Sequence, residues 1–175
     1  MRKAFILMLI CMLTVLATNV TSQTKRRRAA PRRANAATAA TEKSAAEIKA
    51  GAAQVAAQIK TMTHFVYLFG GIAKGIESVD QAASKQEASA AAIEQNERNK
   101  TKVRESIKNV REGLDKLESD FRFNPTLQRY YPYLAGVART GETAENQAAA
   151  NRFDEAGRSL LKVIDQLADA LAAMR

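Results

Sequence analysis

Apolar residues recur at alternating spacings of four and three along two long stretches of the chain. The first stretch consists of Ile48, Ala52, Val55, Ile59, Met62, Val66 and Phe69. The second consists of Val103, Ile107, Val110, Leu114, Leu117 and Phe121. Such spacing keeps one seam of an α-helix facing a partner. It therefore predicts two long amphipathic helices with coiled-coil-like seams, joined by a weaker seam rich in alanine.

The turn between these helices has no proline to mark it, because none occurs between Pro31 and Pro125. Three segments are candidates: the glycine pair at 70–71, the serine-flanked segment 84–89 and the hydrophilic segment 96–101. Serine is a good helix-capping residue, and polar residues surround it in the second candidate. We therefore place the turn at 84–89.

A corner follows the second helix, since Pro125 disfavours helical geometry at the residue before it. We expect a short tyrosine-rich helix over 126–139, closed by Gly141, and a last helix that begins near Glu142. The seam of that last helix is formed by Ala149, Phe153, Ala156, Leu160, Ile164, Leu167, Leu171 and Met174, widened toward the core by Leu161 and Ala168.

These patterns predict an all-α fold. The expected architecture is an antiparallel bundle of three long amphipathic helices plus one short Tyr-rich helix, over residues 42–175. The β-branched residues fall at helical spacing, so we expect no strands.

Residues 1–22 have the organisation of a signal peptide. Two cations precede an apolar stretch, and small residues follow it, which predicts cleavage after Ser22 or Ala17 and a periplasmic or secreted protein. The alternative is an N-terminal membrane anchor, because the stretch is near the minimum length for a span and cations follow it. Cys11, the one cysteine, lies inside this segment, so the exported chain would form no disulfide.

The net charge of +9 is concentrated at the N-terminus. Residues 34–175 carry 19 basic against 18 acidic residues, so the predicted helical domain is nearly neutral. Residues 23–41 read as a disordered basic and alanine-rich linker. Its cations are candidates for binding an anionic polymer or lipid: Lys25, Arg26, Arg27, Arg28, Arg32 and Arg33.

The segment 62–76 is apolar on every face. We expect it to lie in the middle of the bundle, packed on both neighbours. The spacing of Gly71 and Gly75 permits close approach of another helix, and Phe65 and Phe69 precede it. The alternative is a membrane-active bundle that inserts this segment.

The short cross-piece concentrates tyrosines beside a cation. We expect these rings to close one end of the bundle with their hydroxyls toward water. Otherwise they form an exposed patch suited to a protein or glycan partner, consisting of Arg129, Tyr130, Tyr131 and Tyr133.

The sequence offers no catalytic constellation. His64 is the one histidine, expected as a polar residue within the core seam, and it has no metal-ligand or nucleophile partner at a recognised spacing. We therefore expect no enzyme activity, cofactor or metal. The favoured function is an exported, non-enzymatic binding or structural module with an unidentified protein partner and possible self-association, and no small-molecule substrate.

Overall fold

The structure, a computed structural model, describes residues 31–175, which are helical with no strand among them. The all-α class is confirmed for this part of the chain. The predicted signal peptide, its cleavage sites and the linker up to residue 30 lie outside the described residues. Residues 37–175 form one compact unit.

Helix α1 runs from Pro31 to Ser84 and begins well before the expected start at residue 42. Residues 31–41 are therefore helical, where a disordered linker was expected. Proline is tolerated in the first turn of a helix, and the alanines that follow are the strongest helix formers. The glycine pair at 70–71 also lies within α1, since glycine lowers helix propensity without forcing a turn.

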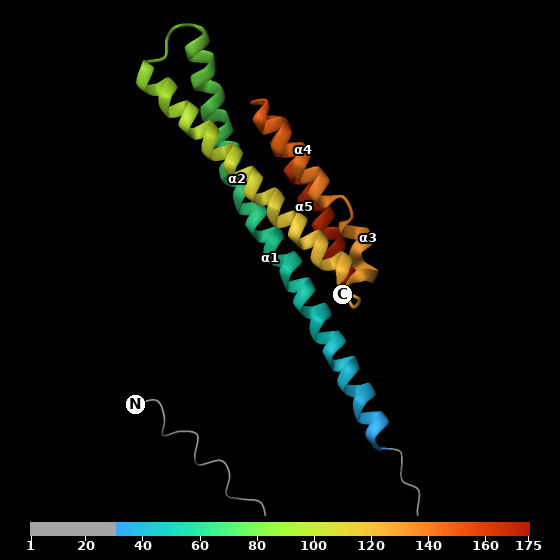
Figure 1. Cartoon of the computed structure of the whole chain (residues 1–175). Helices are drawn as coiled ribbons and strands as arrows, with labels where there is room; N and C mark the ends of the chain where they lie inside the picture. Colours follow the sequence, from blue (N-terminus) through green and yellow to red (C-terminus); the bar gives the residue numbers. More distant parts are fainter. Residues whose placement is uncertain (1–30) are drawn as a thin grey trace, which may run out of the picture. The chain divides into compact units, whose positions relative to one another are not determined.

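The turn into α2, Ala90–Phe123, falls at 84–89 as predicted. The hydroxyl of Ser89 accepts a hydrogen bond from the backbone N–H of Ala92 at 3.2 Å and caps the new helix. Gln86 takes a positive φ of 62° within this turn. The two helices run antiparallel, side by side (Figure 1).

The C-terminal third differs from the prediction. A 3-10 turn, η1, covers Gln128–Tyr130, and α3 covers Tyr131–Leu134. The expected last helix is divided into α4, Val137–Ala149, and α5, Phe153–Ala173. The described part of the chain thus has four longer helices, and the prediction of three was wrong.

The two glycines near this corner explain the difference. Gly136 has a φ of +88°, a left-handed geometry that glycine adopts without steric cost, and it ends the corner before α4. Gly141, expected to end a helix, lies inside α4, where a Cβ would come within 3.0 Å of the Leu114 side chain. Gly141 thus permits close packing between α4 and α2. The turn after α4 instead uses Asn151, with a φ of +60°.

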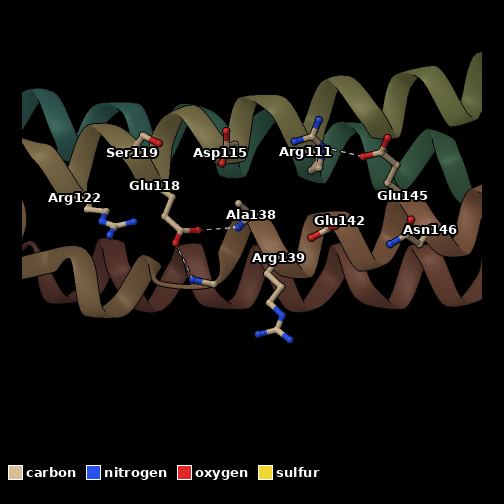
Figure 2. Close-up of a pocket in the computed structure, with 11 residues that line it drawn as sticks. Arg111, Asp115, Glu118, Ser119, Arg122, Ala138, Arg139, Glu142, Glu145 and Asn146 are labelled. Atoms are coloured by element: carbon tan, nitrogen blue, oxygen red, sulfur yellow. Dashed lines mark hydrogen bonds and ion pairs between the residues drawn. The ribbon is translucent and has the colours of Figure 1, made fainter.

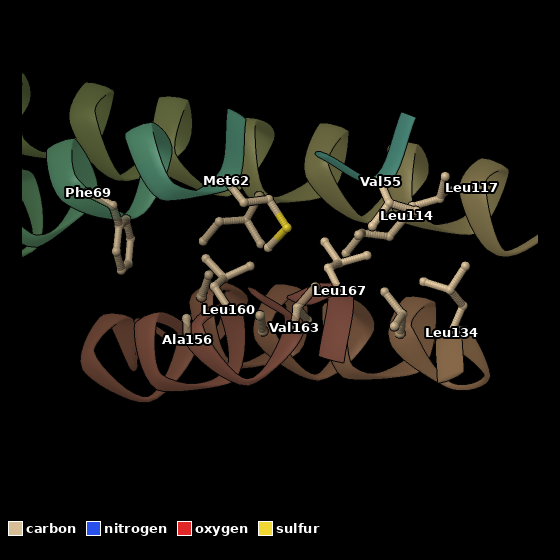
Figure 3. Packing of buried hydrophobic residues seen from close by; sticks show 14 of the residues in the cluster. Val55, Met62, Phe69, Leu114, Leu117, Leu134, Ala156, Leu160, Val163 and Leu167 are labelled. Carbon is tan, nitrogen blue, oxygen red and sulfur yellow. The ribbon is translucent and has the colours of Figure 1, made fainter. Parts of the chain in front are cut away.

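One hydrophobic cluster joins α1, α2, α4 and α5. On α1, buried apolar side chains recur every seven residues, at Val55, Met62, Phe69 and Ile76. We call these four residues the inner stripe. Figure 3 shows the first three of these side chains directed toward the α5 side chains, which include Leu160, Val163 and Leu167. The Phe69 ring lies edge-on to that of Phe153, with centroids 6.4 Å apart.

The predicted α5 seam is partly displaced. Phe153, Ala156, Leu160 and Leu167 are buried as expected, but the core is widened by Val163 and Ala170. Leu161 is 49% exposed, and Ala168 is exposed as well. Leu161 and Ala168 therefore lie outside the part of the α5 apolar face that the described residues cover.

Candidate functional site

A groove between α1 and α2 is lined mainly by apolar side chains, and we call it the outer groove. Its volume is about 620 Å³. The α1 wall is formed by Phe65, Leu68, Ile72, Gly75 and Val79, which we call the outer stripe. The α2 wall includes Ala92, Gln95, Asn99, Lys102 and Ser106.

The floor and rim of the outer groove differ in exposure. Phe69, Ile76 and Val103 line the floor and are buried, so the groove ends on the hydrophobic core. At the rim, Leu68 is 62% exposed and Ile72 is 45% exposed. The outer stripe alternates spacings of three and four, which is the pattern that packs against a helix. Helix α1 therefore has two apolar faces. The described residues cover the inner stripe, whereas the outer stripe keeps Leu68 and Ile72 exposed.

The polar wall of the outer groove carries one cation and no carboxylate. Lys102 is the one charged residue in the lining, and it forms no ion pair with the described residues. The Asn99 side-chain oxygen accepts a hydrogen bond from Gln95 Nε2 at 3.0 Å, which leaves the Asn99 amide N–H groups directed elsewhere. No carboxylate lines the groove, so its electrostatics favour an occupant with acidic groups.

The expectation for segment 62–76 was therefore wrong in part. Met62, Phe69 and Ile76 are buried, but Tyr67 is 83% exposed, so the segment is not packed on every face. A Cβ placed on Gly71 or Gly75 would meet no atom within 4 Å, so these glycines make no close helix contact in the described structure. His64, expected within the seam, is exposed.

Among the described helices, none is both long and apolar enough to cross a membrane. Phe65 stacks on Phe69 with ring centroids 5.7 Å apart, which ties it to the core.

A second groove, of about 680 Å³, lies between α2 and α4 and is lined mainly by charged groups (Figure 2). The Glu118 carboxylate accepts hydrogen bonds from the backbone N–H groups of Gly136 at 3.1 Å and Ala138 at 3.0 Å. A carboxylate at this position satisfies the free donors at the start of α4 and complements its dipole. The Arg111 Nε donates to Glu145 at 2.8 Å. These contacts fix α4 against α2 and are structural.

A buried polar cluster lies near the α1–α2 turn, just beyond the last residue of the inner stripe. Lys100 is 6% exposed, and its ammonium donates to Asp80 at 2.7 Å and to Glu97 at 2.8 Å. Asn96 donates to the same Asp80 oxygen at 2.8 Å. Burial by itself lowers the pKa of Lys100, but the two carboxylates outweigh it and raise this pKa above its ordinary value. The cluster holds α2 to α1 beyond the apolar core.

The tyrosine patch lies on η1 and α3. Tyr130 and Tyr131 are half-buried, Tyr133 is 51% exposed, and Arg129 is exposed. The Arg129 guanidinium lies over the Tyr130 ring, 4.7 Å from its centroid, and donates to its hydroxyl at 2.6 Å. These rings are therefore not enclosed, although the cation of the patch is already engaged.

The predicted polyanion-binding residues are only partly described. Lys25, Arg26, Arg27 and Arg28 lie outside the described residues. Arg32 and Arg33 belong to the first turn of α1.

Comparison of the chain with protein-family models, curated proteins and solved structures finds no match. Within residues 31–175, His, Cys, Asp and Glu side chains form no group of three or more that would hold a metal ion. The candidate site therefore rests on the geometry of the outer groove.

The sequence contained a signal for this groove. The apolar residues of segment 62–76 divide into two helical stripes, and positions 65, 68, 72 and 75 form the second, which continues to Val79. The all-face apolar character of the segment was recognised, but only the fold reveals which stripe the rest of the chain covers.

Proposed function

We propose that this protein is an exported, non-enzymatic binding module, an antiparallel helical bundle that captures an amphipathic helix in its outer groove. The observation that carries the proposal is the uncovered outer stripe, whose exposed Leu68 and Ile72 stand above a buried apolar floor. Contiguous exposed apolar surface with a polar rim is typical of an interaction site. Export itself rests on the signal-like residues 1–22.

The dimensions of the groove favour a helix as occupant. Residues 65–79 of α1 extend over about 21 Å, or about four helical turns. A helix laid along this length places apolar residues at spacings of three and four against the outer stripe. Lys102 on the opposite wall then faces the polar edge of the bound helix.

A membrane surface fits the groove less well. A bilayer is bound by protruding apolar side chains, whereas Phe65 and Val79 line a concavity. The most exposed aromatic residue, Tyr67, lies about 100° round α1 from Leu68, so it does not extend the same face.

Site-specific photo-crosslinking in the producing cell tests the proposal. A photoreactive side chain at Ile72 should yield protein adducts, whereas one at Ile93 should not. Ile93 is a matched control, because it is 41% exposed, against 45% for Ile72, and lies on α2 outside the groove. Equal labelling at the two positions, or adducts with lipid alone, would contradict capture of a helix.

A further inference from the structure

We propose that the occupant of the outer groove is helix α5 of a second copy of this chain, an inference that rests on the function proposed above. The surface that α5 presents is an apolar stripe formed by Leu161, Ile164, Ala168 and Leu171. Their spacings of three, four and three match those of the outer stripe.

The α5 stripe is available in the described structure. Leu161 is 49% exposed and Ala168 is exposed, while Ile164 and Leu171 are half-buried at the edge of the core. Two apolar surfaces of the same chain, one a ridge and one a groove, are thus left uncovered. Burial of both in one contact would remove them from water together.

Charge supports this pairing. Over the length of the α5 stripe, from Leu161 to Leu171, the helix carries two acidic residues, Asp165 and Asp169, and one basic residue, Lys162. Neither carboxylate forms an ion pair with the described residues. At 100° per residue, both carboxylates lie along one edge of the α5 stripe, next to Lys162, and this edge is acidic on balance. Lys102 provides the complementary charge on the wall of the outer groove.

The occupant must come from another molecule. Helix α5 packs on the inner stripe of its own chain, where Phe153 contacts Phe69 and a Cβ on Gly157 would lie 3.1 Å from the Phe69 ring. Reaching its own outer groove would require α5 to leave that core. Because the groove and the α5 stripe are different surfaces, the contact gives a closed two-fold dimer if two copies dock their α5 stripes reciprocally, and otherwise leads to open chains or to closed rings.

Light scattering of the full chain over a range of protein concentrations tests the inference. The wild type should grow in mass with concentration. Lys102→Glu, and Asp165→Lys combined with Asp169→Lys, should each weaken association about tenfold by placing like charges together. Combining all three substitutions should restore association. Failure of the combination to restore it would overturn the pairing of these surfaces.

A mixing experiment separates this contact from pairing of like surfaces. Ile72→Asp disables the groove and leaves the α5 stripe intact, whereas Ala168→Asp does the reverse. Each variant alone should stay monomeric, and an equimolar mixture should form a heterodimer that grows no further. Association of either variant alone would show that like surfaces pair, and a mixture that remains monomeric would show that the groove and the α5 stripe do not meet. Either result would overturn the inference. Both positions are exposed, and circular dichroism verifies folding. If either variant fails to fold, the charge-reversal variants described above determine whether the two surfaces pair.

The two proposals fail in different ways. If the wild type is monomeric at every concentration, self-association is excluded. Binding by the groove still stands in that case if a crosslinker at Ile72 yields adducts with another protein. If Ile72 yields no adduct while the wild type associates, the outer groove is not the contact, and both proposals are excluded.

Discussion

The inner and outer stripes of α1 consist of the same kinds of residue on one helix, yet they differ in how far they are exposed to solvent. Met62 and Phe69 of the inner stripe are 0% and 3% exposed, whereas Leu68 and Ile72 of the outer stripe are 62% and 45% exposed. Apolar residues at helical spacing therefore identify a face that can pack against another helix. Whether the partner is in the same chain depends on how many helices the chain supplies and where they lie.

The comparison predicts the largest effect for Phe69→Ala. Loss of this buried ring should destabilise the protein by about 3–5 kcal/mol, because it removes apolar burial and leaves a cavity between α1 and α5. Leu68→Ala on the outer stripe should change stability by less than about 0.5 kcal/mol. Urea unfolding followed by circular dichroism measures both. Equal losses would mean that the outer stripe is also covered within the chain.

Substitutions in the buried polar cluster around Lys100 should lower the free energy of unfolding by less than Phe69→Ala does. Asp80→Ala removes a partner of Lys100 and of Asn96, so we expect a loss of about 1–3 kcal/mol in unfolding free energy. Glu94→Ala is the control, since it breaks only an exposed pair with Arg98 and should cost less than about 1 kcal/mol. If Asp80→Ala and Glu94→Ala lower the unfolding free energy by similar amounts, the buried cluster stabilises the protein no more than an exposed ion pair does.

The same cluster predicts an alkaline limit to stability. The pKa of Lys100 is raised above the ordinary lysine value of 10.5, so the folded state holds this proton more tightly than the unfolded state. The resulting stabilisation is complete below that value and is lost as the pH rises through the folded pKa. Unfolding midpoints measured above pH 10.5 should fall more steeply for the wild type than for Lys100→Met. Parallel pH curves would contradict the assignment.

The smallest effects separate stability from binding on the outer face. Gly71→Ala and Gly75→Ala should each stabilise the protein by about 0.5–1 kcal/mol, because alanine favours the helix and a Cβ meets no atom within 4 Å at either position. Gly75 lines the groove and Gly71 does not, so only Gly75→Ala should weaken occupation of the groove. Thermal unfolding and light scattering measure the two properties. Equal weakening by both would place the contact elsewhere.

Much of the fold follows from local signals. The all-α class and the turn at 84–89 were predictable because helical spacing and serine capping act over a few residues. The division between α4 and α5 was missed, since Asn151 is one of the non-glycine residues that tolerate positive φ and gives a weak signal. Gly141 was misread because its role is contact with Leu114 of α2, which local sequence does not encode.

The candidate site was visible as an unusual segment but not as a groove. Segment 62–76 was recognised by its apolar faces, yet Gly75 was assigned to close helix packing and proves to line an open surface. The expectation that Leu161 faces the core failed for the same reason. A residue on a wide apolar face is buried only if a neighbour extends over it.

The sequence by itself determined that the chain is helical, where its apolar faces lie and where α1 ends, because hydrogen bonding, capping and residue periodicity are local properties. Only the tertiary structure decided that the inner stripe is covered while the outer stripe and Leu161 are exposed. It also brought Lys100 to Asp80 and Glu118 to the start of α4. These outcomes depend on which helices become neighbours, and that is set by packing of the whole compact unit.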